Sequence, residues 1–149
     1  MTKHYSKKNQ QTFPELLIMG VFRLVWGLVK LIFQGFKPKA RLTVADRNYM
    51  VSKRLEIETM ANSNNIHELR QAVFEADKLV DFALKKQGFA GNNMGERLRS
   101  AASSVERGLY HNLWQGHKLR NELAHESVSH GQGELREAVQ RLLRYISSV

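Results

Sequence analysis

The chain has 149 residues, enough for one domain and a short appendage. Hydrophobic residues make up 42% and charged residues 25% of the sequence, a composition typical of globular proteins. No cysteine is present, which excludes a disulfide framework, thiolate zinc sites, iron–sulfur clusters and a cysteine nucleophile.

The net charge of +9 is concentrated near the N-terminus. Residues 1–41 contain eight lysine and arginine residues and one acid, whereas residues 42–149 contain fifteen basic and thirteen acidic residues. Binding to nucleic acids depends on clustered basic side chains that neutralise phosphates. The near-neutral C-terminal part therefore argues against strong non-specific affinity for RNA, and the basicity indicates a partner of the N-terminal part first.

Residues 1–12 are polar and basic, and we expect a flexible arm there. Residues 13–36 are expected to form one amphipathic helix, because Pro14 suits its first turn and Glu15 suits its positive end. One face of this helix is small or polar, formed by Gly20, Arg23, Gly27, Lys30 and Gln34. The side chains expected to contact a membrane are Phe22, Arg23, Trp26, Lys30 and Phe33.

The residues leave three placements of this helix open. Arg23 lies near the centre of the apolar run, so the free energy of insertion across a bilayer is only marginally favourable. Basic residues flank the helix equally on both sides, which suits a helix lying in the interface of an anionic leaflet. We expect an interfacial or spanning anchor at the cytoplasmic face of a membrane. The alternative is a helix buried in a soluble core.

Residues 37–63 and 64–149 make up the rest of the chain. The first part is poorly periodic, and we interpret it as a connector with a helix over residues 42–62. The expected helices of the second part cover residues 65–87, a stretch that begins at Asn93, residues 108–126 and residues 134–149. No segment alternates as a strand does. The sequence therefore predicts an all-α fold, an antiparallel helical bundle preceded by the N-terminal helix.

Apolar residues in these helices recur at spacings of three and four, which predicts one buried seam. The residues expected in the core are Leu69, Val73, Val80, Leu98, Leu113, Leu142 and Tyr145. Asn65 and Asn93 each precede a glutamate by three residues, a pattern that caps the start of a helix. In the helix that begins near Asn93, we also expect Ala101, Ala102 and Val105 to face inward.

The segment YHNLWQGHKLRNELAHE, residues 110–126, carries three of the six histidines. His117, Asn121 and His125 are four residues apart and so share one helix face, with Arg120 at its edge. A guanidinium binds phosphate oxygens bidentately, and an imidazole titrates near neutrality as an acid or a base. The segment therefore indicates a site that could act on a phosphodiester.

The stretch from Arg120 to His125, RNELAH, resembles the R-x(4–6)-H motif of HEPN domains, including the polar residue that commonly follows the arginine. The order of helices also fits that family, with the motif on the penultimate helix. The segments EADKLVDFALKKQG, MGERLRSA and LWQGHKLRNELAHE are similar to a group of short bacterial proteins with a hydrophobic N-terminal segment. The resemblance covers residues 64–149.

The resemblance implies a metal-independent endoribonuclease that uses no cofactor and acts on RNA as a homodimer, with two motifs facing each other. Arg120 would stabilise the phosphate charge, and Asn121 would orient the catalytic groups. His125 would help to deprotonate the 2′-hydroxyl or to protonate the leaving oxygen. Many HEPN domains are inactive and serve as binding modules. The alternative is therefore a non-catalytic docking or dimerisation module at the membrane, with a protein partner.

Spacing along the helix bears on this hypothesis. Five residues place Arg120 and His125 about 140° apart around a helix, so a second copy across a two-fold axis would present the pair better than one chain does. The other interpretation is structural. In that case Arg120 pairs with Glu106 or Glu126, and His125 lies at the helix C-terminus, where positive charge is favoured.

Overall fold

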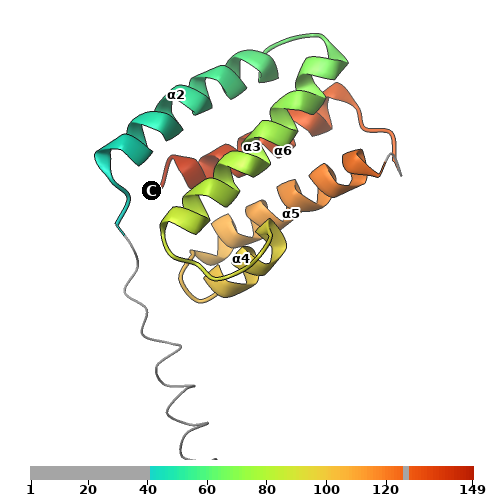
Figure 1. Cartoon of the computed structure of the whole chain (residues 1–149). Helices are drawn as coiled ribbons and strands as arrows, with labels where there is room; N and C mark the ends of the chain where they lie inside the picture. The colour runs from blue at the N-terminus through green and yellow to red at the C-terminus, as the bar shows by residue number, and fades with distance from the viewer. Residues whose placement is uncertain (1–40, 126–127) are drawn as a thin grey trace, which may run out of the picture. The chain divides into compact units, whose positions relative to one another are not determined.

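A computed structural model of the protein describes residues 41–125 and 128–149, and every regular element within them is an α-helix (Figure 1). The helices are α2 (Val44–Ala61), α3 (Ile66–Lys86), α4 (Met94–Ala101), α5 (Arg107–Ala124) and α6 (Gln132–Ile146). The expected arm and amphipathic helix, residues 1–36, lie outside the described residues. None of the described helices combines the length and the apolar character needed to cross a bilayer.

α2 occupies the stretch expected to be a connector, and it packs on α3 and α6 within the compact unit Lys39–Val149. A capping box opens it. The Asp46 backbone N–H donates to Thr43 Oγ1 at 3.1 Å, and the Thr43 N–H donates to the Asp46 carboxylate at 3.0 Å. Met50 and Ile57 are the buried apolar residues of α2. This narrow contribution to the core explains why the sequence of α2 shows little periodicity.

The asparagine caps predicted for α3 and α4 are confirmed, although the Asn65 N–H donates to Ser63 Oγ and Glu96 accepts from the Asn92 N–H, so neither glutamate binds the cap N–H. Asn65 Oδ1 accepts a hydrogen bond from the His67 backbone N–H at 2.9 Å and so satisfies one of the free donors at the start of α3. Asn93 Oδ1 accepts from the Glu96 backbone N–H, also at 2.9 Å, at the start of α4. The two asparagines therefore set where both helices begin.

α4 is shorter than the sequence predicts. Leu98 and Ala101 are buried as expected, and Val105 is half-buried. Ala102 is exposed, because the helix ends at Ala101 and the chain turns toward Glu106, which caps α5. The prediction that Ala102 faces inward is wrong, since helical periodicity does not extend beyond the end of the helix.

Helices that follow one another in the chain run in opposite directions, except for the short α4, whereas α3 and α6 run in the same direction (Figure 1). Two contacts fix this arrangement. Near the C-terminal ends of both helices, Tyr145 Oη of α6 donates to Gln87 Oε1, just after α3, at 3.1 Å. Near the N-terminal end of α6, Arg136 donates to the carbonyls of Ala61 and Ser63, at the turn between α2 and α3.

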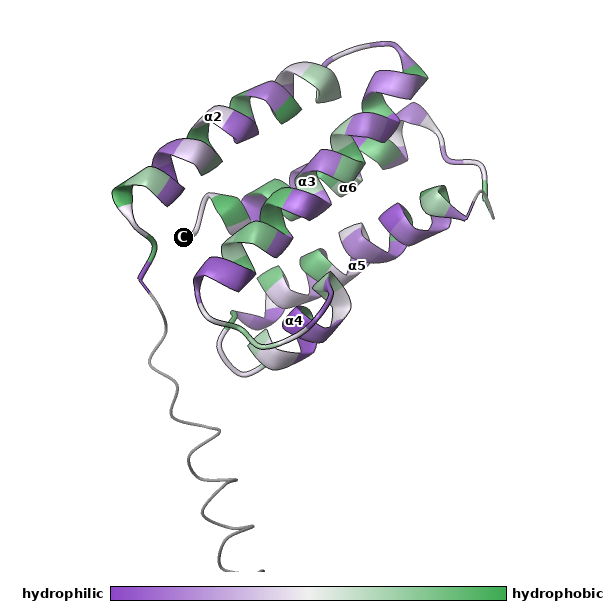
Figure 2. Cartoon of the chain, in the orientation of Figure 1, coloured by the Kyte–Doolittle hydropathy of each residue, from purple (hydrophilic) through white to green (hydrophobic). Residues whose placement is uncertain are grey.

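α3 lies at the centre of the bundle and contacts each of the other described helices. All seven residues predicted for the core are buried, with exposed fractions of 3% or less. Figure 2 shows hydrophobic and hydrophilic residues alternating along the helices, as expected when each helix buries one side. α5 approaches α6 closely at Gly116, where an added Cβ atom would lie 2.6 Å from Leu142 Cγ. The position of α5 therefore depends on the absence of a side chain at residue 116.

Candidate active site

The site is built on the face of α5 that meets α3. Arg120 and Asn121, both predicted from the sequence, lie here together with His117. The fourth member is Asp77, on the central helix α3, with an exposed fraction of 4%. Asp77 is the charged residue in an otherwise apolar set of buried positions on α3. The site therefore joins two helices around one buried carboxylate.

The four side chains form a closed ring, which we call the Asp77 ring. Asp77 Oδ1 lies 2.8 Å from His117 Nδ1, and His117 Nε2 lies 3.3 Å from Asn121 Nδ2. Asn121 Oδ1 accepts a hydrogen bond from Arg120 Nη1 at 3.1 Å. Arg120 Nε lies 3.6 Å from Asp77 Oδ2, which closes the ring with an ion pair. Each carboxylate oxygen of Asp77 therefore faces a different basic side chain.

The ring determines how its neutral members are oriented. A carboxylate accepts hydrogen bonds, so the contact with Asp77 requires the proton of His117 to be on Nδ1. In the neutral imidazole the lone pair is then on Nε2, and the Asn121 amide nitrogen donates to it. With its amide nitrogen toward His117, Asn121 places its amide oxygen toward Arg120, which donates to it. The ring therefore presents His117 in one tautomer, with the basic nitrogen away from Asp77.

Arg120 is held from several sides. Its guanidinium carbon lies 5.4 Å from the centre of the Phe74 ring, a cation–π contact with α3. Its Nε is buried and makes no hydrogen bond to any described residue, although the Asp77 carboxylate is close. About a third of the side chain, 32%, remains exposed. Arg120 therefore both binds Asp77 and reaches the surface, where it lines a hollow of about 440 Å³ with His117 and Asn121.

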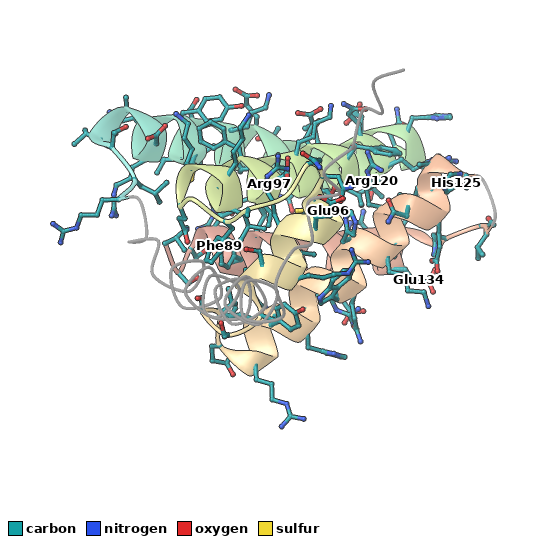
Figure 3. The ribbon with its side chains drawn as sticks, turned by 60° about the horizontal axis from the view of Figure 1, so that its bottom comes forward. Phe89, Glu96, Arg97, Arg120, His125 and Glu134 are labelled. Carbon is teal, nitrogen blue, oxygen red and sulfur yellow. The ribbon has the colours of Figure 1, made fainter. Side chains whose placement is uncertain are left out.

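His125 is placed differently from Arg120. It is the residue that caps the C-terminus of α5; it is exposed, and its backbone N–H donates to Asn121 O at 3.1 Å. Figure 3 shows Arg120 at the junction of α3 and α5 and His125 at the far end of α5. The Asp77 ring closes without His125. The structural interpretation placed His125 at the helix C-terminus, and that placement is confirmed.

A surface pocket of about 540 Å³ nevertheless connects His125 to the ring. It runs along α5, and its lining includes His117, Asn121 and His125, together with Trp114 and Lys118. Trp114 is only half-buried, and its ring contacts His117 edge-on with ring centres 6.0 Å apart. With His111, Gln115 and Glu122, the pocket combines three imidazoles, two amides, a lysine, a carboxylate and an aromatic ring.

The acidic partner of Arg120 differs from those considered in the sequence. Glu106 caps α5 instead: its carboxylate accepts from the backbone N–H groups of Gly108 and Leu109 at 2.7 and 2.8 Å, which lowers the pKa of Glu106. Glu126 lies outside the described residues. Sequence reasoning missed Asp77, although a carboxylate within the apolar seam of the helix over residues 65–87 was the available signal.

A second ion pair lies beside the ring. Arg97 of α4, with an exposed fraction of 8%, places Nη1 2.6 Å from Asp81 Oδ1 on α3. This ion pair links α4 to α3 one helical turn after Asp77. Among residues 41–125 and 128–149, no group of three or more His, Asp or Glu side chains has the arrangement needed to hold a metal ion. The Asp77 ring itself brings together an imidazole, a guanidinium, an amide and a carboxylate.

No protein-family model, curated protein or solved structure is significantly similar to this chain.

Proposed function

We propose that this protein is a membrane-associated, HEPN-like endoribonuclease that cleaves RNA without a metal ion, using Arg120, Asn121 and His125. The observation that carries the proposal is the pocket of about 540 Å³ along α5, which Asn121 and His125 line together with His117. Arg120 does not line this pocket; it lines the neighbouring hollow of about 440 Å³, and its hydrogen bond to Asn121 links the two. The RNELAH motif, which resembles that of HEPN domains, thus borders a pocket large enough for a nucleotide.

The reaction is a transfer of the phosphodiester to a neighbouring hydroxyl. The 2′-oxygen of RNA attacks the adjacent phosphorus as its proton leaves, and the bond to the 5′-oxygen breaks as that oxygen gains a proton. The products are a 2′,3′-cyclic phosphate and a 5′-hydroxyl. The guanidinium of Arg120 stabilises the charge on the phosphate oxygens, and imidazoles move the protons.

Two copies of the chain complete the site in this proposal. Arg120 and His125 lie five residues apart on α5, and His125 is at the end of the helix, so one chain separates them. A two-fold axis beside α5 brings the His125 of one copy toward the Arg120 of the other. The homodimer accounts for why both motif residues reach the surface although they are separated within one chain.

Cleavage by the full chain in the presence of EDTA tests this function. We expect single-stranded RNA to yield 2′,3′-cyclic phosphate ends, and DNA of the same sequence to remain intact because it lacks the attacking hydroxyl. Arg120→Ala and His125→Ala should each reduce the rate about 100-fold or more, the range for loss of one catalytic group. His67→Ala, which removes an exposed histidine on α3, is the matched control and should cleave normally. Intact RNA after prolonged incubation with the wild-type chain contradicts the proposal.

Residues 13–36 supply the membrane association in this proposal, because their apolar surface and their basic side chains occur in the same segment. The full chain should float with vesicles that contain anionic lipid, and a chain that begins at Leu42 should remain at the bottom of the gradient. Replacing Arg23 and Lys30 by glutamine while keeping the apolar residues separates the electrostatic part of the affinity. Equal flotation of the two chain lengths contradicts the anchor.

A non-catalytic docking module is the second candidate, and α2 favours it. Val44, Val51 and Leu55 lie on one side of α2 with exposed fractions of 75%, 61% and 60%. Their spacing of seven and four residues places them on one face, with the exposed Asn48 between Val44 and Val51. Such a face suits a partner helix. Binding of the membrane and of a partner by a wild-type chain that leaves RNA intact would favour this candidate.

A further inference from the structure

We infer that His117, held by Asp77, is the base that takes the proton from the 2′-hydroxyl, and that the His125 of a second copy is the acid. This inference rests on the proposed ribonuclease function. It differs from the simple motif assignment, in which His125 is the working histidine beside Arg120. The reasons are the connectivity of the Asp77 ring, the tautomer that the ring imposes, and the distance between the two histidines along α5.

Connectivity favours His117. Its ring is in hydrogen-bonding contact with Asn121, which in turn binds Arg120, so three of the groups that a phosphodiester needs are already assembled on adjacent turns of α5. His117 also lines both surface hollows, the one that contains Arg120 and the one that contains His125. It is therefore the histidine that can contact a substrate bound against Arg120.

Asp77 makes His117 suitable as a base. The carboxylate holds the proton on Nδ1 at 2.8 Å, so the lone pair is on Nε2, the nitrogen that faces Asn121 and the pocket. Asp77 is also close enough to stabilise the imidazolium that forms when Nε2 takes a proton. Because Asp77 is 4% exposed and does not line the larger pocket, it is a positioning residue that acts through His117.

The distance along α5 assigns the acid to another copy. Eight residues separate His117 from His125, which corresponds to about 12 Å of rise along a helix. Two groups that serve the attacking and leaving oxygens of one phosphate must be closer than this, since both hydrogen bond to the same substrate. His125, exposed at the end of α5, is free to reach across a two-fold axis to the His117 of the other copy.

The proposed reaction moves two protons. The 2′-hydroxyl first replaces the Asn121 amide as the hydrogen-bond partner of His117 Nε2. Nε2 then takes the proton of the 2′-hydroxyl while the bond between the 2′-oxygen and phosphorus forms. The bond between phosphorus and the 5′-oxygen breaks, and that oxygen takes a proton from the imidazolium of His125 of the second copy. His117 later releases its proton to solvent, and His125 gains one. No electron transfer occurs.

Mixing two inactive variants of the full chain tests the assignment. His117→Ala and His125→Ala should each lose about 100-fold or more of the rate, while the melting temperature and helical signal show that both remain folded. After subunit exchange, mixed dimers contain one site with both histidines, and activity should return to roughly a quarter of the wild-type value. A His117→Gln variant, which keeps a polar side chain near Asp77, should lose activity as His117→Ala does.

The outcomes separate this inference from the function on which it rests. Wild-type activity in the His117 variants overturns the inference and leaves the ribonuclease in place, and so does an inactive mixture of two folded variants that exchange subunits. A wild-type chain without activity overturns both. Asp77→Asn should lower kcat by about tenfold or more with little change in KM, because it disturbs the orientation of His117 and not substrate binding. Equal effects on kcat and on the fraction folded would show that Asp77 is only structural.

Discussion

α5 and α6 both pack on the central helix α3, but they bring different surfaces to it. The buried residues of α6, from Leu135 to Ile146, are all hydrophobic. α5 buries only Leu113, Gly116 and Leu123, and its contact with α3 includes the Asp77 ring and the cation–π contact between Arg120 and Phe74. One helix thus completes the core, whereas the other holds polar and charged groups against the core in fixed positions.

Apolar contacts and buried ion pairs contribute differently to the stability of the fold. Burying apolar surface stabilises the fold by roughly 25 cal/mol per Å². A buried ion pair contributes little, because the attraction between the charges is largely offset by the cost of removing them from water. A fold that needed only stability would place hydrophobic residues between α3 and α5 as it does between α3 and α6. The Asp77 ring therefore makes the contact between α3 and α5 polar, whereas the contact between α3 and α6 is apolar.

The largest loss of stability is expected from a substitution in α6. Leu142→Ala should lower the free energy of unfolding by about 2–5 kcal/mol, because Leu142 is fully buried and its loss leaves a cavity beside α5. Chemical denaturation of the full chain measures the change. Gln140→Ala, at an exposed position of the same helix, is the control and should change stability by less than about 0.5 kcal/mol. A similar value for both variants would mean that α6 is not the core helix.

A smaller loss of stability is expected from a substitution in the Asp77 ring. Asp77→Ala should cost about 1–3 kcal/mol, because it leaves His117 and Arg120 without their buried acceptor. Lys78→Ala, at the exposed neighbouring position, is the control. Adding His117→Leu should recover part of the loss, since an apolar pair can replace a polar one. A loss as large as that of Leu142→Ala would remove the contrast between α5 and α6.

Acid denaturation tests how the carboxylate of Asp46 in α2 contributes to stability. Hydrogen bonds from the Lys86 ammonium and from Thr43 lower the pKa of Asp46 from 3.8 to about 2. A pKa lowered by folding means that the unfolded chain binds the proton more readily, so Asp46 stabilises the fold above pH 3.8 and loses this contribution as the pH falls through 2. In Asp46→Asn, denaturant midpoints measured between pH 5 and 2 should fall less steeply than in the wild type. Parallel curves would contradict the contact with Lys86.

The smallest change in stability is expected at the end of α5. His125→Ala should shift the free energy of unfolding by less than about 0.5 kcal/mol, because the side chain is exposed and the helix cap uses the backbone N–H. Thermal unfolding followed by circular dichroism is the measurement. A loss above about 1 kcal/mol would give His125 a structural role and would weaken its assignment to catalysis.

Local patterns in the sequence were enough for most of the fold. Asn65 and Asn93 gave the starts of two helices, and the three- and four-residue spacing gave the core, because both signals act between residues close in the chain. Periodicity also predicts too long a helix at α4, because the apolar spacing continues to Ala102 whereas the helix ends at Ala101. α2 was the least predictable helix, since only two apolar residues are buried on it.

The site was less accessible to sequence reasoning. Arg120, Asn121 and His125 could be selected because they are neighbours on one helix. Asp77 is 40 residues before His117, and their contact depends on how far α3 and α5 slide past each other when they pack. No local rule gives that register. Asp77 was nevertheless visible as a carboxylate on the apolar side of its helix, where an unpaired charge is costly.

The close approach of Gly116 to Leu142 constrains how this protein can evolve. A methyl group at residue 116 would lie too close to the Leu142 side chain, so Leu142 or α5 would have to shift, and His117 is the next residue along α5. A smaller residue at 142 would make room for that side chain, but the loss of buried apolar volume would lower stability. The space for a side chain next to His117 therefore depends on the size of a core residue of α6.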